Sequence, residues 1–105
     1  MKEISVQELK SWKESGKTFQ LIDVRDNYEY EWNNIDGTCI PLNTVLDNLD
    51  RINREGDVVI HCNSGNRAVA LIDILTNRHG FNNLINLKGG IEAWAEEIDS
   101  SKMAY

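Results

Sequence analysis

The chain alternates short apolar runs of strand length with longer segments in which apolar residues recur at helical spacing. The clearest run, 58–61, is rich in β-branched residues, which favour strands. It is followed at the spacing of one buried helix face by Ala68, Leu71, Ile72 and Leu75. This alternation predicts an α/β fold, in which helices cover both faces of a parallel sheet and ligands bind beyond the carboxyl ends of the strands.

The remaining elements follow the same pattern. Ser5 begins a capping box, which predicts a helix start. Asn43 is expected to cap a further helix, whose inward-facing residues are Val45, Leu46 and Leu49. The other expected elements are strands at 19–24, 38–40 and 84–87 and helices that begin near Asp26 and Gly90. Packing in the core or between helix and sheet is expected for Trp12, Trp32 and Trp94, with one of them at the rim of the site as the alternative.

Length and charge restrict the classes of protein that this chain can belong to. At 105 residues it is long enough for one hydrophobic core and too short for two ordinary domains. We expect a single domain over 1–105, with its core at about 4–98 and a C-terminal tail at 99–105. The net charge of −6 argues against general binding to nucleic acid or to anionic membranes. Without a signal peptide or a spanning segment, a cytoplasmic location is expected.

The chain has two cysteines, Cys39 and Cys62, and a cytoplasmic location predicts that both stay reduced. The only histidines are His61 and His79, and no zinc spacing is present, so we expect no metal and no other cofactor. Cys39 precedes Pro41 in an apolar strand, which favours a small packed residue over a disulfide partner for Cys62. The side chain of His61 is expected on the opposite sheet face from that of Cys62.

The segment from Cys62 to Arg67 joins the run 58–61 to the next helix. Between them lie small, polar or conformationally permissive residues: Asn63, Ser64, Gly65 and Asn66. Such a loop can turn successive N–H groups toward one point, and the positive end of the helix adds to the attraction for an anion. These groups and Arg67 favour a thiolate at that point, so the loop predicts a nucleophilic cysteine. The alternative is that Cys62 is a buried core residue.

Three motifs occur in order along the chain. They are Leu-Ile-Asp-Val-Arg at 21–25 with Tyr-Glu-Tyr at 28–30, Cys-x-x-Gly-x-Arg at 62–67, and the segment 80–94 with its Lys-Gly-Gly-Ile-Glu-Ala-Trp end. Together they resemble the signatures of the rhodanese domain family of sulfurtransferases, over almost the whole chain. The resemblance implies a three-layer fold with a central, mostly parallel sheet of about five strands and helices on both faces.

The resemblance also implies a double-displacement reaction. The Cys62 thiolate takes the outer sulfur of a donor, holds it as a persulfide, and passes it to a thiol or another nucleophilic acceptor, which can be a protein. Backbone N–H groups from Asn63 to Arg67 are expected to stabilise negative charge on the sulfur in both halves of the cycle. Because Asn63, Ser64 and Asn66 are neutral, thiosulfate and a persulfide both stay open as donors.

Two other functions fit parts of the pattern. His61 and Cys62, followed by glycine and arginine, are similar to the start of a cysteine-dependent phosphatase loop. That loop has five residues between cysteine and arginine and this one has four, which disfavours a phosphatase. A non-enzymatic persulfide carrier, or a redox-responsive module that binds a partner, would have the same loop, so enzyme and carrier stay open as alternatives.

Asp23 and Arg25 lie at the end of a strand beside the expected site. Either they line the site and support Arg67, or Arg25 pairs with Glu29 or Glu31 to hold the following helix. The structural interpretation is favoured, because charged pairs at strand ends usually organise loops.

Overall fold

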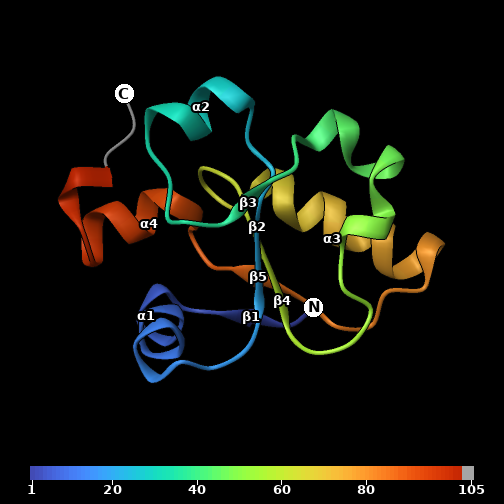
Figure 1. The fold of residues 1–105 in the computed structure, drawn as a ribbon, viewed down its shortest axis with the longest axis horizontal. Coiled ribbons are helices and arrows are strands. Elements are labelled where there is room, and N and C mark those ends of the chain that lie inside the picture. The colour runs from blue at the N-terminus through green and yellow to red at the C-terminus, as the bar shows by residue number, and fades with distance from the viewer. Residues whose placement is uncertain (103–105) are drawn as a thin grey trace.

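The centre of the fold is one sheet of five strands, all parallel, in a computed structural model that describes residues 1–102 (Figure 1). The strands are β1 (Glu3–Ile4), β2 (Gln20–Asp23), β3 (Thr38–Cys39), β4 (Val58–His61) and β5 (Leu84–Leu87), in the spatial order β1-β5-β4-β2-β3. The predicted α/β fold is therefore confirmed. The sequence did not predict β1, because a strand of two residues has too few positions to show a period.

Helices cover both faces of the sheet (Figure 1). The α-helices are α1 (Val6–Ser15), α2 (Asn27–Trp32), α3 (Asn66–His79) and α4 (Gly90–Glu97), and the 3₁₀ helices are η1 (Leu42–Asp47), η2 (Leu49–Arg51) and η3 (Ser100–Lys102). On one face Val59 of β4 belongs to the same apolar cluster as residues of α1 and α4. On the other face its neighbours Val58 and Ile60 cluster with residues of α3 and η1. Alternate residues of β4 thus face two separate halves of the core.

The capping box of α1 and the apolar stripe and final glycine of α3 are found at the residues that the sequence predicted. The backbone N–H of Glu8 donates to Ser5 Oγ at 3.1 Å, and the backbone N–H of Ser5 donates to Glu8 Oε1 at 3.3 Å, which completes the capping box of α1. The predicted stripe of α3 is buried, and that helix ends before Gly80 as expected. These local signals therefore predicted helix boundaries correctly.

The segment after Pro41 differs from its prediction. It forms the 3₁₀ helix η1 from Leu42 and not an α-helix capped by Asn43, because the backbone N–H and hydroxyl of Thr44 both donate to the carbonyl of Pro41 at 2.8 Å and close a tight turn. Val45 is fully buried as expected, but Leu46 is 56% exposed. Consecutive residues of a 3₁₀ helix are separated by about 120° around its axis, and here Leu46 points away from the side on which Val45 is buried.

The structure also tests the predictions for the three tryptophans and for the C-terminal tail. Trp94 is buried in the core and Trp12 packs against it, but Trp32 is 62% exposed, so its predicted packing is wrong. The start of the expected tail is folded as η3, and the side-chain amide of Asn33 donates to the carbonyl of Lys102 at 3.1 Å. The last part of the tail, 103–105, lies outside the described residues. Among the helices of residues 1–102, none has the length and apolarity needed to cross a lipid bilayer.

The different burial of neighbouring residues in η1 gives a stability prediction. We expect Val45→Ala to lower the free energy of unfolding by about 2 kcal/mol, because it removes fully buried methyl groups. Leu46→Ala is the matched control and should change that free energy by less than about 0.5 kcal/mol. Urea unfolding measures both values, and equal losses in the two variants would contradict this position of η1.

Candidate active site

The site lies where two neighbouring strands lead the chain in opposite directions. β2 and β4 pair with each other, while β3 lies beyond β2 and β5 lies beyond β4. The connections after β2 and β4 therefore diverge, and ligands of parallel sheets commonly bind beyond the carboxyl ends of two such strands. Cys62 follows directly after β4, at this end of the sheet, as the sequence predicted.

The sulfur of Cys62 is buried and accepts a backbone hydrogen bond. The side chain is 1% exposed and packs on the α3 side of the sheet. The N–H of Gly65, the residue before α3, donates to Cys62 Sγ at 3.2 Å. Cys62 therefore has features of both interpretations. It is packed in the core, as a buried structural cysteine would be, and its sulfur accepts from an amide at a helix start, as expected for a nucleophile. Residues of β4 alternate between the two faces, so His61 lies on the same face as Val59 and opposite to Cys62, as predicted.

The first turn of α4 is hydrogen-bonded to the start of the loop that follows β4. The N–H groups of Ile91 and Glu92 donate to the carbonyls of Cys62 and Asn63, each at 3.0 Å. Gly90, directly before Ile91, has φ of 59°, and a Cβ atom there would stand 2.5 Å from the oxygen of Cys62 and 2.4 Å from that of Asn63. Only glycine permits this approach. The sequence placed a helix start at Gly89-Gly90 but did not predict this contact, although two adjacent glycines are a signal for close backbone packing.

Glu29 of α2 connects the first and second motifs. Its Oε1 accepts from Asn63 Nδ2 at 2.9 Å, its Oε2 accepts from the N–H of Asp26 at 2.8 Å, and Arg67 Nη1 lies 3.7 Å from that second oxygen. Burial acts to raise the pKa of Glu29, but the hydrogen bonds from Asp26 and Asn63 and the charges of Arg67 and Arg25 outweigh it and lower the pKa. The carboxylate is therefore charged at neutral pH beside the loop. Sequence reasoning placed Glu29 in the first motif but considered it as a partner only for Arg25.

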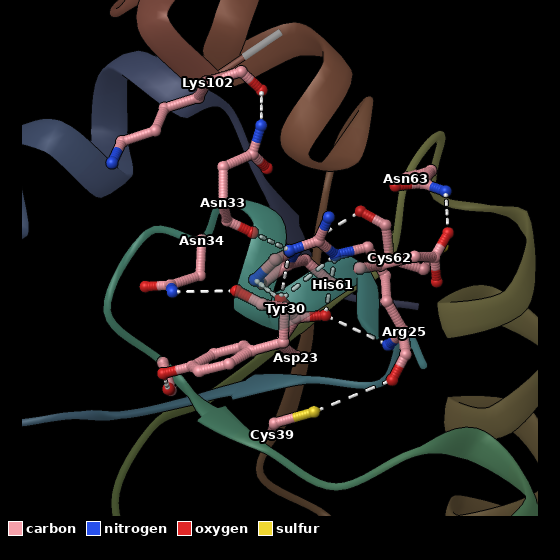
Figure 2. A network of polar contacts seen from close by, with 12 residues as sticks. Asp23, Arg25, Tyr30, Asn33, Asn34, Cys39, His61, Cys62, Asn63 and Lys102 are labelled. Atoms are coloured by element: carbon pink, nitrogen blue, oxygen red, sulfur yellow. Dashed lines mark hydrogen bonds and ion pairs between the residues drawn. The ribbon is translucent and has the colours of Figure 1, made fainter. Parts of the chain in front are cut away.

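Beneath the loop lies a fully buried ion pair between Asp23 and Arg25 (Figure 2). Arg25 Nε donates to Asp23 Oδ1 at 3.0 Å and Arg25 Nη2 donates to Asp23 Oδ2 at 2.8 Å. Nη2 also donates to the carbonyl of Asn33 at 2.7 Å, which ties the end of α2 to β2. The structural interpretation of the pair is supported, but the predicted partners were wrong, because Arg25 pairs with Asp23 and not with Glu29 or Glu31.

His61 completes the buried polar group under the loop. Its Nε2 lies 3.7 Å from Asp23 Oδ2, and its Nδ1 lies 3.3 Å from the carbonyl of Cys62. Burial, opposed by the charge of Asp23, lowers the pKa of His61 below its ordinary value. The ring is therefore neutral at neutral pH and supports the backbone at the site.

Cys39 is the second free thiol and lies at the edge strand β3. Its Sγ is 3.7 Å from the carbonyl of Arg25 (Figure 2). It is also 3.5 Å from Asn27 Oδ1. Burial and the charge of Asp23 raise the pKa of this thiol, so it is a poorer nucleophile at neutral pH. It is half-buried, in accord with the expected packing role. Within residues 1–102 no group of three or more His, Cys, Asp or Glu side chains could hold a metal ion.

The contact at Gly90 gives a prediction with a matched control. Gly90→Ala places a methyl group against two carbonyl oxygens and breaks the hydrogen bonds that hold the loop, so we expect a loss of about 3 kcal/mol in the free energy of unfolding. Gly16→Ala introduces the same left-handed strain, at φ of 73°, in open space, and should cost only about 1 kcal/mol. Chemical denaturation compares the two variants, and equal losses would show that α4 does not constrain the loop.

The buried histidine gives a pH prediction. Below pH 6.5 the unfolded chain protonates His61, whereas the folded protein resists protonation there because the pKa is lowered. Stability is therefore lost as the pH falls below about 6.5, with a slope of at most about 1.4 kcal/mol per pH unit from this residue. Unfolding free energies between pH 7.5 and about 5.5 should fall less steeply in His61→Gln than in the wild type. The control variant is His79→Gln, at the other, partly exposed histidine. A slope in His61→Gln equal to that of the wild type would contradict the assignment of this pH dependence to His61.

Comparison with known proteins agrees with the three motifs. The rhodanese-like domain family matches residues 5–97. A protein of Allochromatium vinosum named "Sulfurtransferase" is 34% identical over 71% of this chain and 70% of its own length. The "Probable adenylyltransferase/sulfurtransferase MoeZ" of Mycobacterium tuberculosis is 30% identical over 97% of this chain, which spans only 26% of that protein.

A solved structure agrees with the fold. The rhodanese-like domain protein from Staphylococcus aureus is 31% identical and superposes with a TM-score of 0.83, over 93% of this chain and 95% of the other. The family match covers most of the chain, and the overall fold superposes on that of a rhodanese-like domain protein. The chain belongs to the rhodanese-like domain family.

Proposed function

We propose that this chain is a sulfurtransferase domain that carries a sulfane sulfur as a persulfide on Cys62. The observation that supports this function is the position of the Cys62 sulfur, at the carboxyl end of β4 and 3.2 Å from the N–H of Gly65. A thiolate in this position has a hydrogen-bond donor and the positive end of α3 beside it. Cys62 is the proposed catalytic residue, and the loop from Asn63 to Arg67 is the proposed sulfur-binding segment.

The hydrogen bonds from α4 support the proposed role of the loop amides. In a planar trans peptide the C=O and N–H groups point in opposite directions. Because the carbonyls of Cys62 and Asn63 point toward α4, the N–H groups of Asn63 and Ser64 point away from it. Together with Gly65 they are donors available to a charged sulfur on the inner side of the loop.

The proposed reaction has two displacement steps. The Cys62 thiolate attacks the outer sulfur of a donor R–S–S⁻, a new S–S bond forms, and the donor's own S–S bond breaks with its electron pair leaving on the thiolate R–S⁻. An acceptor thiolate then attacks the terminal sulfur of the Cys62 persulfide and releases the Cys62 thiolate. Charge and electrons balance in each step, so the cycle needs no metal and no redox cofactor.

The charge beside the loop favours a monoanionic donor. Glu29 is ionised next to Asn63 and partly neutralises Arg67, and the loop side chains themselves are uncharged. Because Glu29 offsets Arg67, little positive charge is left to compensate for the larger desolvation cost of a dianion such as thiosulfate or a phosphate monoester, and a monoanionic persulfide has a smaller cost. We therefore propose a persulfide as the preferred donor. A cytoplasmic location fits this chemistry, since Cys62 must be reduced to begin the cycle.

Intact mass spectrometry tests the proposed function. Reduced protein is incubated with thiosulfate or with glutathione persulfide, and the mass is compared among wild type, Cys62→Ser and Cys39→Ser. We expect a gain of one sulfur atom in the wild type and in Cys39→Ser, and no gain in Cys62→Ser. The proposal is wrong if neither donor adds a sulfur to the wild type, or if the added sulfur is retained in Cys62→Ser.

Turnover separates an enzyme from a carrier. With donor and a small acceptor thiol both in excess, an enzyme should produce sulfide or a new persulfide over many cycles at a rate that depends on Cys62. A carrier would load once and then retain its sulfur in the presence of that thiol. The measurement is the molar amount of transferred sulfur per mole of protein over time.

A further inference from the structure

An apolar hollow lies against the start of α3, next to the loop that carries Cys62. Its volume is about 420 Å³. Its apolar wall comes from Leu42 and Leu46 of η1 and from Ala70 and Ile74 of α3, and its polar end is formed by Asn66 and Arg67. The two polar residues are also the last two of the Cys62 loop, so the hollow and the proposed site share one border.

The structure departs from the sequence prediction at this hollow. Leu46 was expected to face inward, but it is exposed at the rim, and Leu42 and Ile74 are exposed beside it. Large exposed apolar residues that gather around one concave surface indicate a binding site more than chance exposure does. The size of the hollow and its apolar lining with a few polar groups at one end are typical of small-molecule sites.

The charge distribution specifies the kind of occupant. Arg67 is the one charged residue among those that line the hollow within residues 1–102, and its side chain is 37% exposed. A ligand that fits has a single negative charge at the end next to the loop and an apolar group along η1 and α3. From Asn66 to Ile74 the helix rises by about 12 Å, which accommodates a six-membered ring or a short alkyl chain.

We infer that the hollow binds the apolar substituent of a small organic sulfur donor, of the type R–S–S⁻ or R–SO₂–S⁻, while its outer sulfur reaches Cys62. This inference rests on the proposed sulfurtransferase function and names the class of donor for it. With a thiosulfonate, the Cys62 thiolate attacks the outer sulfur, the S–S bond to the sulfonyl sulfur breaks, and the sulfinate R–SO₂⁻ leaves with the electron pair. The products are the Cys62 persulfide and one sulfinate, so atoms and charge balance.

Two residues of α3 form a matched pair for the test. Ile74 lines the hollow and is 40% exposed, whereas Val69 is 38% exposed on the same helix and does not line the hollow. Both side chains are β-branched and can be replaced by asparagine with similar effects on the helix. A difference between Ile74→Asn and Val69→Asn therefore reports on the hollow and not on the stability of α3.

The experiment measures the rate of sulfur loading on Cys62 with three donors: benzenethiosulfonate, methanethiosulfonate and thiosulfate. We expect Ile74→Asn to lower the second-order rate constant for the phenyl donor about tenfold, because less apolar surface is buried in the complex. The rates with the methyl donor and with thiosulfate should change less than about twofold, and Val69→Asn should leave all three rates near those of the wild type.

The outcomes separate this inference from the proposed function. If no donor adds sulfur to Cys62 in the wild type, the proposed function itself is wrong. If Cys62 loads but Ile74→Asn slows the phenyl and methyl donors by the same factor, or Val69→Asn has the same effect as Ile74→Asn, the hollow does not bind the substituent. Thermal unfolding of both variants checks that neither loss of rate reflects a loss of folded protein.

Discussion

Two backbone hydrogen bonds from the first turn of α4 to the carbonyls of Cys62 and Asn63 hold the candidate site together. The first N–H groups of a helix have no partner within the helix, and here two of them bind a loop and not a ligand. Because those carbonyls point toward α4, the N–H groups of Asn63 and Ser64 point away from it. The approach is close enough that Gly90 has no space for a side chain. The geometry around the sulfur therefore depends on an element that begins 28 residues after Cys62.

The charges around the loop are arranged in two layers. The deeper layer is the buried pair of Asp23 and Arg25, with neutral His61 beside it, and it joins the ends of β2, β4 and α2. The desolvation of two buried charges offsets much of their attraction, and the contact that Arg25 adds is its hydrogen bond to the carbonyl of Asn33. The outer layer is Glu29, which holds Asn63 and faces Arg67. The two layers contact the loop through Asn63, Arg67 and the carbonyl of Cys62, and their paired charges add little net charge beside it.

Much of the fold could be predicted because its signals are local. The capping box at Ser5, the stripe of α3 and the β-branched run of β4 each depend on neighbours within one or two turns, and they predicted elements that the structure contains. The position of Cys62 followed from the same patterns, since a parallel sheet exposes the carboxyl ends of its strands. The strand β1 was missed because its two residues have no pattern of their own and depend on pairing with β5.

The parts that sequence reasoning missed depend on contacts between distant segments or on side-chain geometry. The partner of Arg25 lies two residues away, but the fork of its guanidinium reaches Asp23 only because both are buried at the same strand end. The turn of Thr44 onto Pro41 replaced an expected α-helix with η1 and turned Leu46 outward, which opened the hollow beside α3. The contact of α4 with the Cys62 loop joins two motifs that the sequence shows only as separate signatures.

The central claim is that this loop holds a sulfur anion on Cys62 with its backbone N–H groups. A crystal structure of the protein after treatment with a sulfane donor tests it most directly. The account predicts one additional sulfur bonded to Cys62 Sγ, with the N–H groups of the loop, including that of Gly65, within hydrogen-bond distance of the sulfur pair, and the bonds from α4 unchanged. Additional sulfur on Cys39, or a persulfide on Cys62 that points away from the loop amides, would contradict it.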